Sequence, residues 1–237
     1  MNRINLPGKE KTKKRILIIL VIVSIGVLIY EGSINLQKKK SEIKDNGQKQ
    51  EEIIKPINED KEDSDEVKEK INNISQKESD LYNEAYTLFF SNKYEDAINK
   101  ANELLKNFPD SYMGYNIRGI AKAYSGDYDG GMEDIDNSLK INETYGYGRF
   151  NKALTYELYD NMDEALKWYN KALEVEEYVW SYYGIASIYG RKADVANTMK
   201  YLNKAISMDS EVRVVAKDEH DFDPVRNSKE FQEAVYN

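Results

Sequence analysis

The sequence has no cysteine and one histidine, His220, among its 237 residues. The absence of cysteine excludes a disulfide framework, a thiolate metal site and a cysteine nucleophile. A single histidine cannot form a multi-histidine metal site. An enzyme centred on His220, between Glu219 and Asp221, would need a nucleophile that no motif supplies. We therefore expect no metal, no cofactor and no catalytic residue.

Positive charge is scarce in the larger part of the chain. Residues 81–237 carry 18 Lys and Arg against 27 Asp and Glu, whereas residues 1–50 carry 11 against 4. Nucleic-acid binding requires a basic surface that neutralises phosphates. The acidic body therefore argues against nucleic acid as a partner.

Alanine is absent before Ala85, and this bears on the apolar run Ile16–Tyr30. The run follows a basic segment, residues 1–15, and spans about 22 Å as a helix of ~1.5 Å rise per residue. That is short for a membrane core of about 30 Å, but Ile34 and Leu36 extend it. Because no small-residue cleavage site follows, residues 16–36 are predicted to be an uncleaved transmembrane anchor. A cleaved signal peptide is the alternative.

The basic residues around this segment also predict its orientation. Six Lys and Arg precede it, and Lys14 and Arg15 abut it, whereas the five that follow begin only at Lys38. The more basic flank stays in the cytoplasm. We expect a single-pass protein of the cell membrane with a cytoplasmic N-terminus and an extracytoplasmic body.

Residues 37–77 are polar and rich in charge. Such a segment buries too little apolar surface to offset the entropy of ordering. We expect a mostly disordered linker, in which Val67, Ile71 and Ile74 indicate a short helix that leads into the body.

From residue 78 onward the sequence repeats with a period of 34. Leu105, Leu139 and Leu173 share one column, and small residues form two others: Ala85, Gly119, Ala153, Ala186 and Ala97, Gly131, Ala165, Thr198. Small side chains allow two helices to cross closely. The period predicts four hairpins (78–111, 112–145, 146–178 and 179–212) that stack because one hairpin cannot bury its own apolar face. In the second, helices are expected over 112–125 and 128–141, with Asp127 as the N-cap of the latter.

These columns resemble the tetratricopeptide repeat family, whose pattern is W-x2-L-G-x2-Y, A-x3-F and P. The matching residues include Tyr115, Gly119, Gly131 and Ile135 in the second unit and Ala153, Tyr156, Ala165 and Tyr169 in the third. Three charged residues, Glu84, Arg118 and Lys152, stand where the family has leucine. The resemblance implies an all-α, right-handed solenoid of about four repeats. Residues 213–237 look like the helical cap that closes bacterial repeats of this family.

The resemblance also implies a partner-binding groove, lined by the first helix of each repeat. The implied function is a membrane-tethered scaffold for a protein or peptide partner; the alternative is a secreted binder of an extended peptide or glycan. The family's Lys and Asn clamp for a carboxyl terminus is missing, since Tyr82, Tyr86 and Ile117 hold its places. The groove residues expected are Tyr82, Tyr86, Phe89, Phe90, Met113, Asn116, Tyr124, Tyr147, Phe150, Leu158, Trp180, Tyr183 and Arg191.

Overall fold

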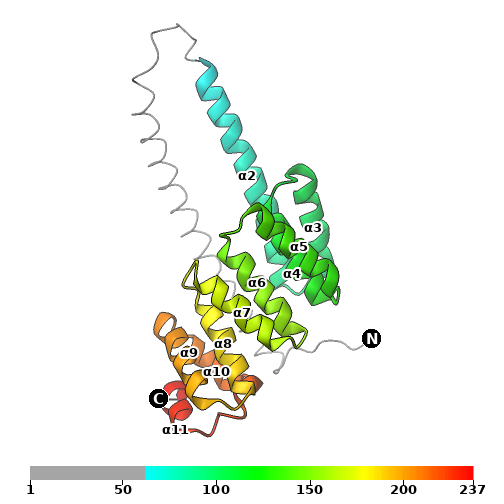
Figure 1. Cartoon of the computed structure of the whole chain (residues 1–237). Coiled ribbons are helices and arrows are strands. Elements are labelled where there is room, and N and C mark those ends of the chain that lie inside the picture. The colour runs from blue at the N-terminus through cyan, green and yellow to red at the C-terminus, as the bar shows by residue number, and fades with distance from the viewer. Residues whose placement is uncertain (1–61, 237) are drawn as a thin grey trace. The chain divides into compact units, whose positions relative to one another are not determined.

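The computed structural model describes residues 62–236, which are helical and contain no strand (Figure 1). The predicted basic segment, the anchor and the linker as far as residue 61 lie outside the described residues. Within the described range, no helix combines the length and the hydropathy that crossing a membrane requires. Residues 77–236 form one compact unit, and residues 62–76, the first half of helix α2, belong to a second unit.

Four helical hairpins follow one another along the chain, and a short helical segment closes them. In the last three hairpins the first helix packs on the second, and α4 also contacts α3 and α6; in the first hairpin, Glu84 of α2 pairs with Lys100 of α3. The helices are α2 (Glu62–Phe90), α3 (Tyr94–Asn107), α4 (Tyr112–Ser125), α5 (Tyr128–Ile141), α6 (Gly146–Leu158), α7 (Met162–Leu173), α8 (Val179–Arg191), α9 (Val195–Met208), α10 (Val212–Asp218), the 3-10 turn η1 (His220–Phe222) and α11 (Lys229–Tyr236).

Helix α2 starts earlier than the sequence analysis predicted. Residues 62–77, assigned there to a mostly disordered linker, are helical. The range from Glu62 to Phe90 contains neither proline nor glycine, so no residue in it interrupts a helix. The indicated short helix is therefore the beginning of the first long one.

The turns inside the hairpins repeat the period of the sequence. One residue in each has a left-handed backbone: Asn92 (φ 59°), Gly126 (φ 104°), Asp160 (φ 65°) and Ala193 (φ 56°). Asn, Gly and Asp tolerate this conformation, whereas alanine adopts it at a cost. The second helix then begins at once; in the second hairpin Asp127 caps α5, its Oδ1 accepting from the Gly130 backbone N–H at 3.0 Å, as predicted.

The small-residue columns mark the helix crossings. A Cβ atom on Gly119 of α4 would lie 2.7 Å from the carbonyl oxygen of Gly131 on α5, and a Cβ on Gly131 would lie 2.8 Å from that of Gly119. Ala153 and Ala165 take these places in the third hairpin and are fully buried. The predicted close approach is thus present in the second hairpin, and the third hairpin buries alanines at the same places.

The charged residues in the leucine column each form an ion pair with a neighbouring second helix. The Lys100 Nζ lies 2.8 Å from Glu84 Oε2, and Arg118 Nη2 lies 2.6 Å from Asp134 Oδ1. Lys152 pairs closely with Asp136 of the preceding hairpin. In the fourth hairpin the same place holds Ile185, which is fully buried.

The segment after α9 caps the last hairpin, as predicted. Phe222 and Phe231 are fully buried, and the Phe222 ring contacts the Tyr183 ring edge-on at 5.6 Å between centroids. A Cβ atom on Gly190 of α8 would lie 2.7 Å from the Asp221 carbonyl oxygen. The cap therefore sits directly on α8.

Candidate functional site

The first helices of the hairpins, α2, α4, α6 and α8, carry all the residues predicted for the groove. We call these four the inner helices. Helices α4 and α6 contact each other directly, although α5 lies between them in the chain. Side chains from successive inner helices can therefore contribute to one surface.

Aromatic rings on α2 and α4 form a first cluster. The Tyr86 and Phe90 ring centroids are 4.5 Å apart, and Tyr82 lies 5.8 Å from Tyr86. Phe89 meets Tyr124 of α4 edge-on at 5.3 Å. The structure thus joins predicted groove residues of the first two hairpins through ring contacts.

A second aromatic cluster connects α6 with its neighbours. The Phe150 ring stacks with Tyr147 at 5.8 Å and meets Tyr178, at the start of α8, at 4.9 Å. Phe150 also contacts Tyr169 of α7 at 5.7 Å. Burial raises the pKa of the Tyr147 hydroxyl well above its usual 10, so this group stays neutral and acts as a hydrogen-bonding group only.

The predicted residues differ in how much surface they offer. Seven are less than a tenth exposed: Tyr82, Tyr86, Phe89, Phe90, Asn116, Phe150 and Trp180. The other six keep more surface: Met113, Tyr124, Tyr147, Leu158 and Tyr183 are half-buried, and the Arg191 side chain is 36% exposed. The second set is the one that a partner can contact directly.

Several buried polar atoms on the inner helices have no hydrogen-bond partner within residues 62–236. Both amide atoms of Asn116 are in this group, as are Trp180 Nε1, Ser181 Oγ and the Tyr183 hydroxyl. An unsatisfied buried polar group costs about 1–3 kcal/mol. Their concentration on α4 and α8 gives these helices unused hydrogen-bonding capacity.

A part-buried ionic cluster, which the sequence pattern did not indicate, lies at the junction of the third hairpin, the fourth hairpin and the cap. Glu157 of α6 accepts from the Tyr169 hydroxyl at 2.6 Å, from Ser187 Oγ at 3.2 Å and from Arg191 Nη2 at 2.9 Å. Arg191 also pairs with Asp221 of the cap, Nε to Oδ1 at 2.7 Å. Burial raises the pKa of Glu157 to about 7. Of these residues, only Arg191 is among the predicted groove residues, because repeat columns carry no information on contacts with a non-repeating cap.

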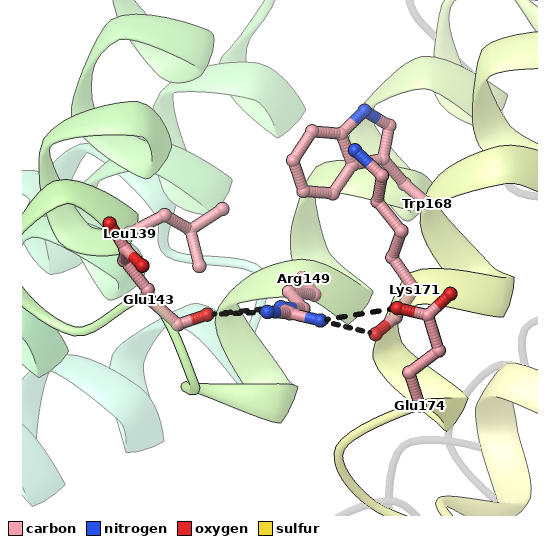
Figure 2. A pocket seen from close by; sticks show the side chains of 6 residues that line it. All are labelled: Leu139, Glu143, Arg149, Trp168, Lys171 and Glu174. Atoms are coloured by element: carbon pink, nitrogen blue, oxygen red, sulfur yellow. Dashed lines mark hydrogen bonds and ion pairs between the residues drawn. The ribbon is translucent and has the colours of Figure 1, made fainter.

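A second feature missing from the prediction is a cavity of about 300 Å³ between the C-terminal ends of α5 and α7. In Figure 2, Leu139 and Glu143 lie on one side of it, Trp168, Lys171 and Glu174 on the other, and Arg149 between them. Arg149 donates to the main-chain oxygens of Glu143 (Nη2, 2.8 Å) and Lys171 (Nη1, 2.8 Å). The guanidinium thus holds the ends of two hairpins together.

His220 lies at the surface of the cap. Its Nδ1 is 3.0 Å from Asp223 Oδ2, and this hydrogen bond raises the pKa of the imidazole. The hydroxyl of Ser187 pairs with Asp221 instead. In the described part of the chain, no group of three acidic or histidine side chains is arranged to hold a metal ion.

The chain is similar to known helical-repeat sequences. The tetratricopeptide repeat family model matches residues 148–178 and 181–212. Tetratricopeptide repeat protein 6 of Homo sapiens is 24% identical over 127 residues, 53% of this chain and 24% of that protein. Small glutamine-rich tetratricopeptide repeat-containing protein 2 of Saccharomyces cerevisiae is 26% identical over 144 residues, 60% of this chain and 39% of that protein. The chain thus spans well under half the length of these relatives.

Solved structures share the fold. The thermophilic TPR protein TTC0263 of Thermus thermophilus aligns with a TM-score of 0.53 at 18% identity, over 58% of this chain and 78% of that one. PilW, a type IV pilus biogenesis factor, aligns with a TM-score of 0.52 at 16% identity, over 68% of this chain and 79% of that one. At these identities the likeness concerns the helical architecture alone.

Proposed function

We propose that this chain, which is a tetratricopeptide-repeat protein, is a scaffold that binds an extended segment of a protein or peptide on its inner helices. Stacked helical repeats present extended surfaces to such partners. The proposal assigns the chain no catalytic step, since His220 faces solvent beside Asp223.

One observation carries the proposal: half-buried aromatic side chains lie on successive inner helices. Tyr147 and Tyr183 offer flat apolar area with few rotatable bonds, which suits them as interface anchors. Met113, Tyr124 and Leu158 are also half-buried, so side chains of α4, α6 and α8 remain open to a partner.

We further propose that residues 16–36 anchor the chain in the cell membrane and that the residues after them tether the repeats outside the cytoplasm. The support is the apolar run Ile16–Tyr30, the abutting Lys14 and Arg15, and the lack of a small-residue cleavage site. A tether would present the inner helices to partners near the membrane. A secreted binder is the competing possibility.

Peptide-array binding tests the scaffold proposal. The double variant Tyr147→Ala, Tyr183→Ala removes two half-buried inner rings, and we expect the affinity for selected peptides to fall at least about tenfold, as for interface anchors. Tyr201→Ala on α9, whose half-buried ring stacks on Tyr189 at 5.9 Å, is the matched control. If the double variant keeps its helical circular dichroism and binds all peptides as before, the inner helices are not the binding surface.

Fractionation of cells tests the tether. An intact N-terminus found by mass spectrometry in the membrane fraction, together with release of a variant lacking residues 16–36, supports the anchor. A mature N-terminus after residue 30 in the soluble fraction supports the secreted binder. Protease access to the repeats in intact cells then reports the orientation.

A further inference from the structure

The ionic cluster that joins the last two hairpins to the cap contains more carboxylates than cations. Glu157 and Asp221 share the single guanidinium of Arg191, which reaches Glu157 Oε1 at 2.9 Å and Asp221 at 2.7 Å. Two hydroxyls complete the cluster, since Ser187 contacts both carboxylates and Tyr169 donates to Glu157. With both carboxylates ionised, one negative charge remains uncompensated in a largely buried place.

The helices and the cap around Glu157 all place ionisable side chains near its carboxyl group. Among the described residues, Arg191 is the cation that contacts Glu157. The surrounding groups are Tyr124 of α4, Tyr169 of α7, Tyr183 and Arg191 of α8, and Glu219 and Asp221 of the cap. The Glu157 side chain is 9% exposed. Burial, followed by the nearby Asp221, also raises the pKa of Glu219. The surrounding tyrosines are neutral and Glu219 is itself an acid, so none of these groups compensates the excess negative charge of Glu157 and Asp221.

The cluster lies where the cap docks. Asp221 belongs to η1, whose next residue, Phe222, packs against Tyr183 of α8. The Asp221 main chain rests on Gly190, leaving no room for a side chain there. Any movement of η1 away from α8 therefore separates Asp221 from Arg191 and uncovers one face of Tyr183.

We propose that Glu157, Arg191 and Asp221 form a proton-dependent latch, which holds the cap on the fourth hairpin when the carboxylate pair binds one proton and loosens when both are ionised. In the closed state the proton, taken from water, resides on Glu157 and removes the excess charge. In the open state Arg191 pairs with Glu157 alone, and the proton returns to water. Because Tyr183 and Arg191 are inner-helix residues, the latch controls access to the end of the inner surface.

The sign of the pH dependence follows from linkage. In the closed state burial raises the pKa of Glu157 from its usual 4.5 to about 7, and withdrawal of the cap admits water and lowers this pKa toward its usual value. Because the closed state raises the pKa of Glu157, protonation of Glu157 favours closure of the cap. This contribution is complete below about pH 4.5 and is lost as pH rises through about 7. With these two values, the opening equilibrium of the cap rises about twentyfold or more between pH 5.5 and pH 8.

Hydrogen–deuterium exchange of the full chain, read on peptides from residues 212–236 and corrected for the intrinsic pH dependence of exchange, tests the latch. We expect protection of the cap to fall about twentyfold from pH 5.5 to pH 8 in the unmodified chain. Glu157→Gln, which mimics the protonated side chain, should keep the cap protected at both pH values. Glu164→Gln on α7, where Glu164 pairs with Lys167 at the surface, should retain the full pH dependence.

A second variant, Asp221→Asn, tests the proposal even if Glu157→Gln does not fold. Asp221→Asn leaves one carboxylate for one guanidinium and removes the share of the raised Glu157 pKa that comes from Asp221, so the pH dependence of cap exchange should become smaller, while burial, the larger cause, remains. Circular dichroism confirms that the helices persist. A cap whose protection is independent of pH in the unmodified chain, or a pH dependence that neither Glu157→Gln nor Asp221→Asn diminishes, overturns the proposal.

Discussion

Single charged residues in this protein replace a leucine position of the repeat and are matched by partners on adjacent helices. Glu84 pairs with Lys100, Arg118 with Asp134 and Lys152 with Asp136. Arg118 and Lys152 are largely buried and each has a carboxylate partner, because a charge buried alone would be strongly unfavourable.

Asp134 is the most buried member of these pairs and gives the first prediction. Its carboxylate is 4% exposed and receives Arg118 (Nε to Oδ2, 2.8 Å) and Lys122 (2.7 Å). Asp134→Ala should lower the free energy of unfolding by about 3 kcal/mol because two part-buried cations lose their counter-ion. Urea unfolding measures the change, with Glu133→Ala, at an exposed neighbouring position, as the control. An unchanged midpoint would mean that Arg118 and Lys122 are adequately solvated without Asp134.

At the scale of helices and turns, a left-handed residue separates the two helices of every hairpin. Three of the four hairpins use Asn, Gly or Asp there, but the fourth uses Ala193, with φ 56°. A Cβ in this conformation costs roughly 1 kcal/mol. Gly126 has no Cβ, and Asn and Asp offset part of this cost through local hydrogen bonds of their short polar side chains. Ala193 has neither advantage, so the fourth turn stores the most strain.

Ala193→Gly should therefore stabilise the protein by about 0.5–1 kcal/mol, even though it removes a side chain. Ala196→Gly, three residues later in the first turn of α9, should destabilise it by up to about 1 kcal/mol because helical glycine loses more entropy. Thermal melts of the two variants should move in opposite directions. Movement of both to lower temperature would contradict the strain argument.

The crossing of α4 and α5 depends on two glycines. Gly119→Ala would place a Cβ 2.7 Å from the Gly131 carbonyl oxygen and 2.8 Å from Ile135 Cγ1. We expect a net loss of about 1–2 kcal/mol, since overpacking exceeds the gain in helix propensity. Asn203→Ala, at an exposed helical site on α9, controls for propensity and should not destabilise. Differential scanning calorimetry compares the melting temperatures of the Gly119→Ala and Asn203→Ala variants. Equal melting temperatures would show that the crossing of α4 and α5 accommodates the added methyl group without a loss of stability.

The period of the sequence was sufficient to predict the hairpins, as α4 and α5 show: both begin and end at the predicted residues. Gly119 and Gly131 signalled their crossing because a helix contact needs small residues at fixed intervals. The Glu157 cluster had no such signal, since it joins a hairpin to a cap that does not repeat. The start of α2 was missed because its first turns are polar and lack the apolar surface from which an ordered segment is usually recognised.

At the scale of the whole molecule, stability comes from the stacking of one hairpin on the next. Helix α4 packs against α3 and α6, and α5 packs against α6. Their fully buried side chains, Ile117, Ile120 and Ile135, would be more exposed in an isolated hairpin. Repeat arrays gain much of their stability from such interfaces.

A peptide of residues 112–145 should therefore be largely unfolded in water, whereas a chain of residues 62–237 should be helical and unfold cooperatively. Helices of 14 residues are marginal alone. Circular dichroism at 222 nm gives the comparison, with trifluoroethanol added to show that the peptide can become helical. A peptide as helical in buffer as the same residues in the longer chain would mean that the hairpin does not need its neighbours.

The positions of the two tryptophans allow fluorescence and circular dichroism to follow the unfolding of the two halves of the repeat array separately. Trp168 is flanked by the ammonium groups of Lys152 and Lys171, each 4.1 Å from its ring centroid, and Trp180 is buried at the start of α8. The first two hairpins contain no indole. Tryptophan emission, excited at wavelengths that tyrosine does not absorb, therefore reports on the C-terminal half alone, while the far-ultraviolet signal averages over all helices. Divergence of the two curves during denaturation would locate a boundary between independently melting segments without any label.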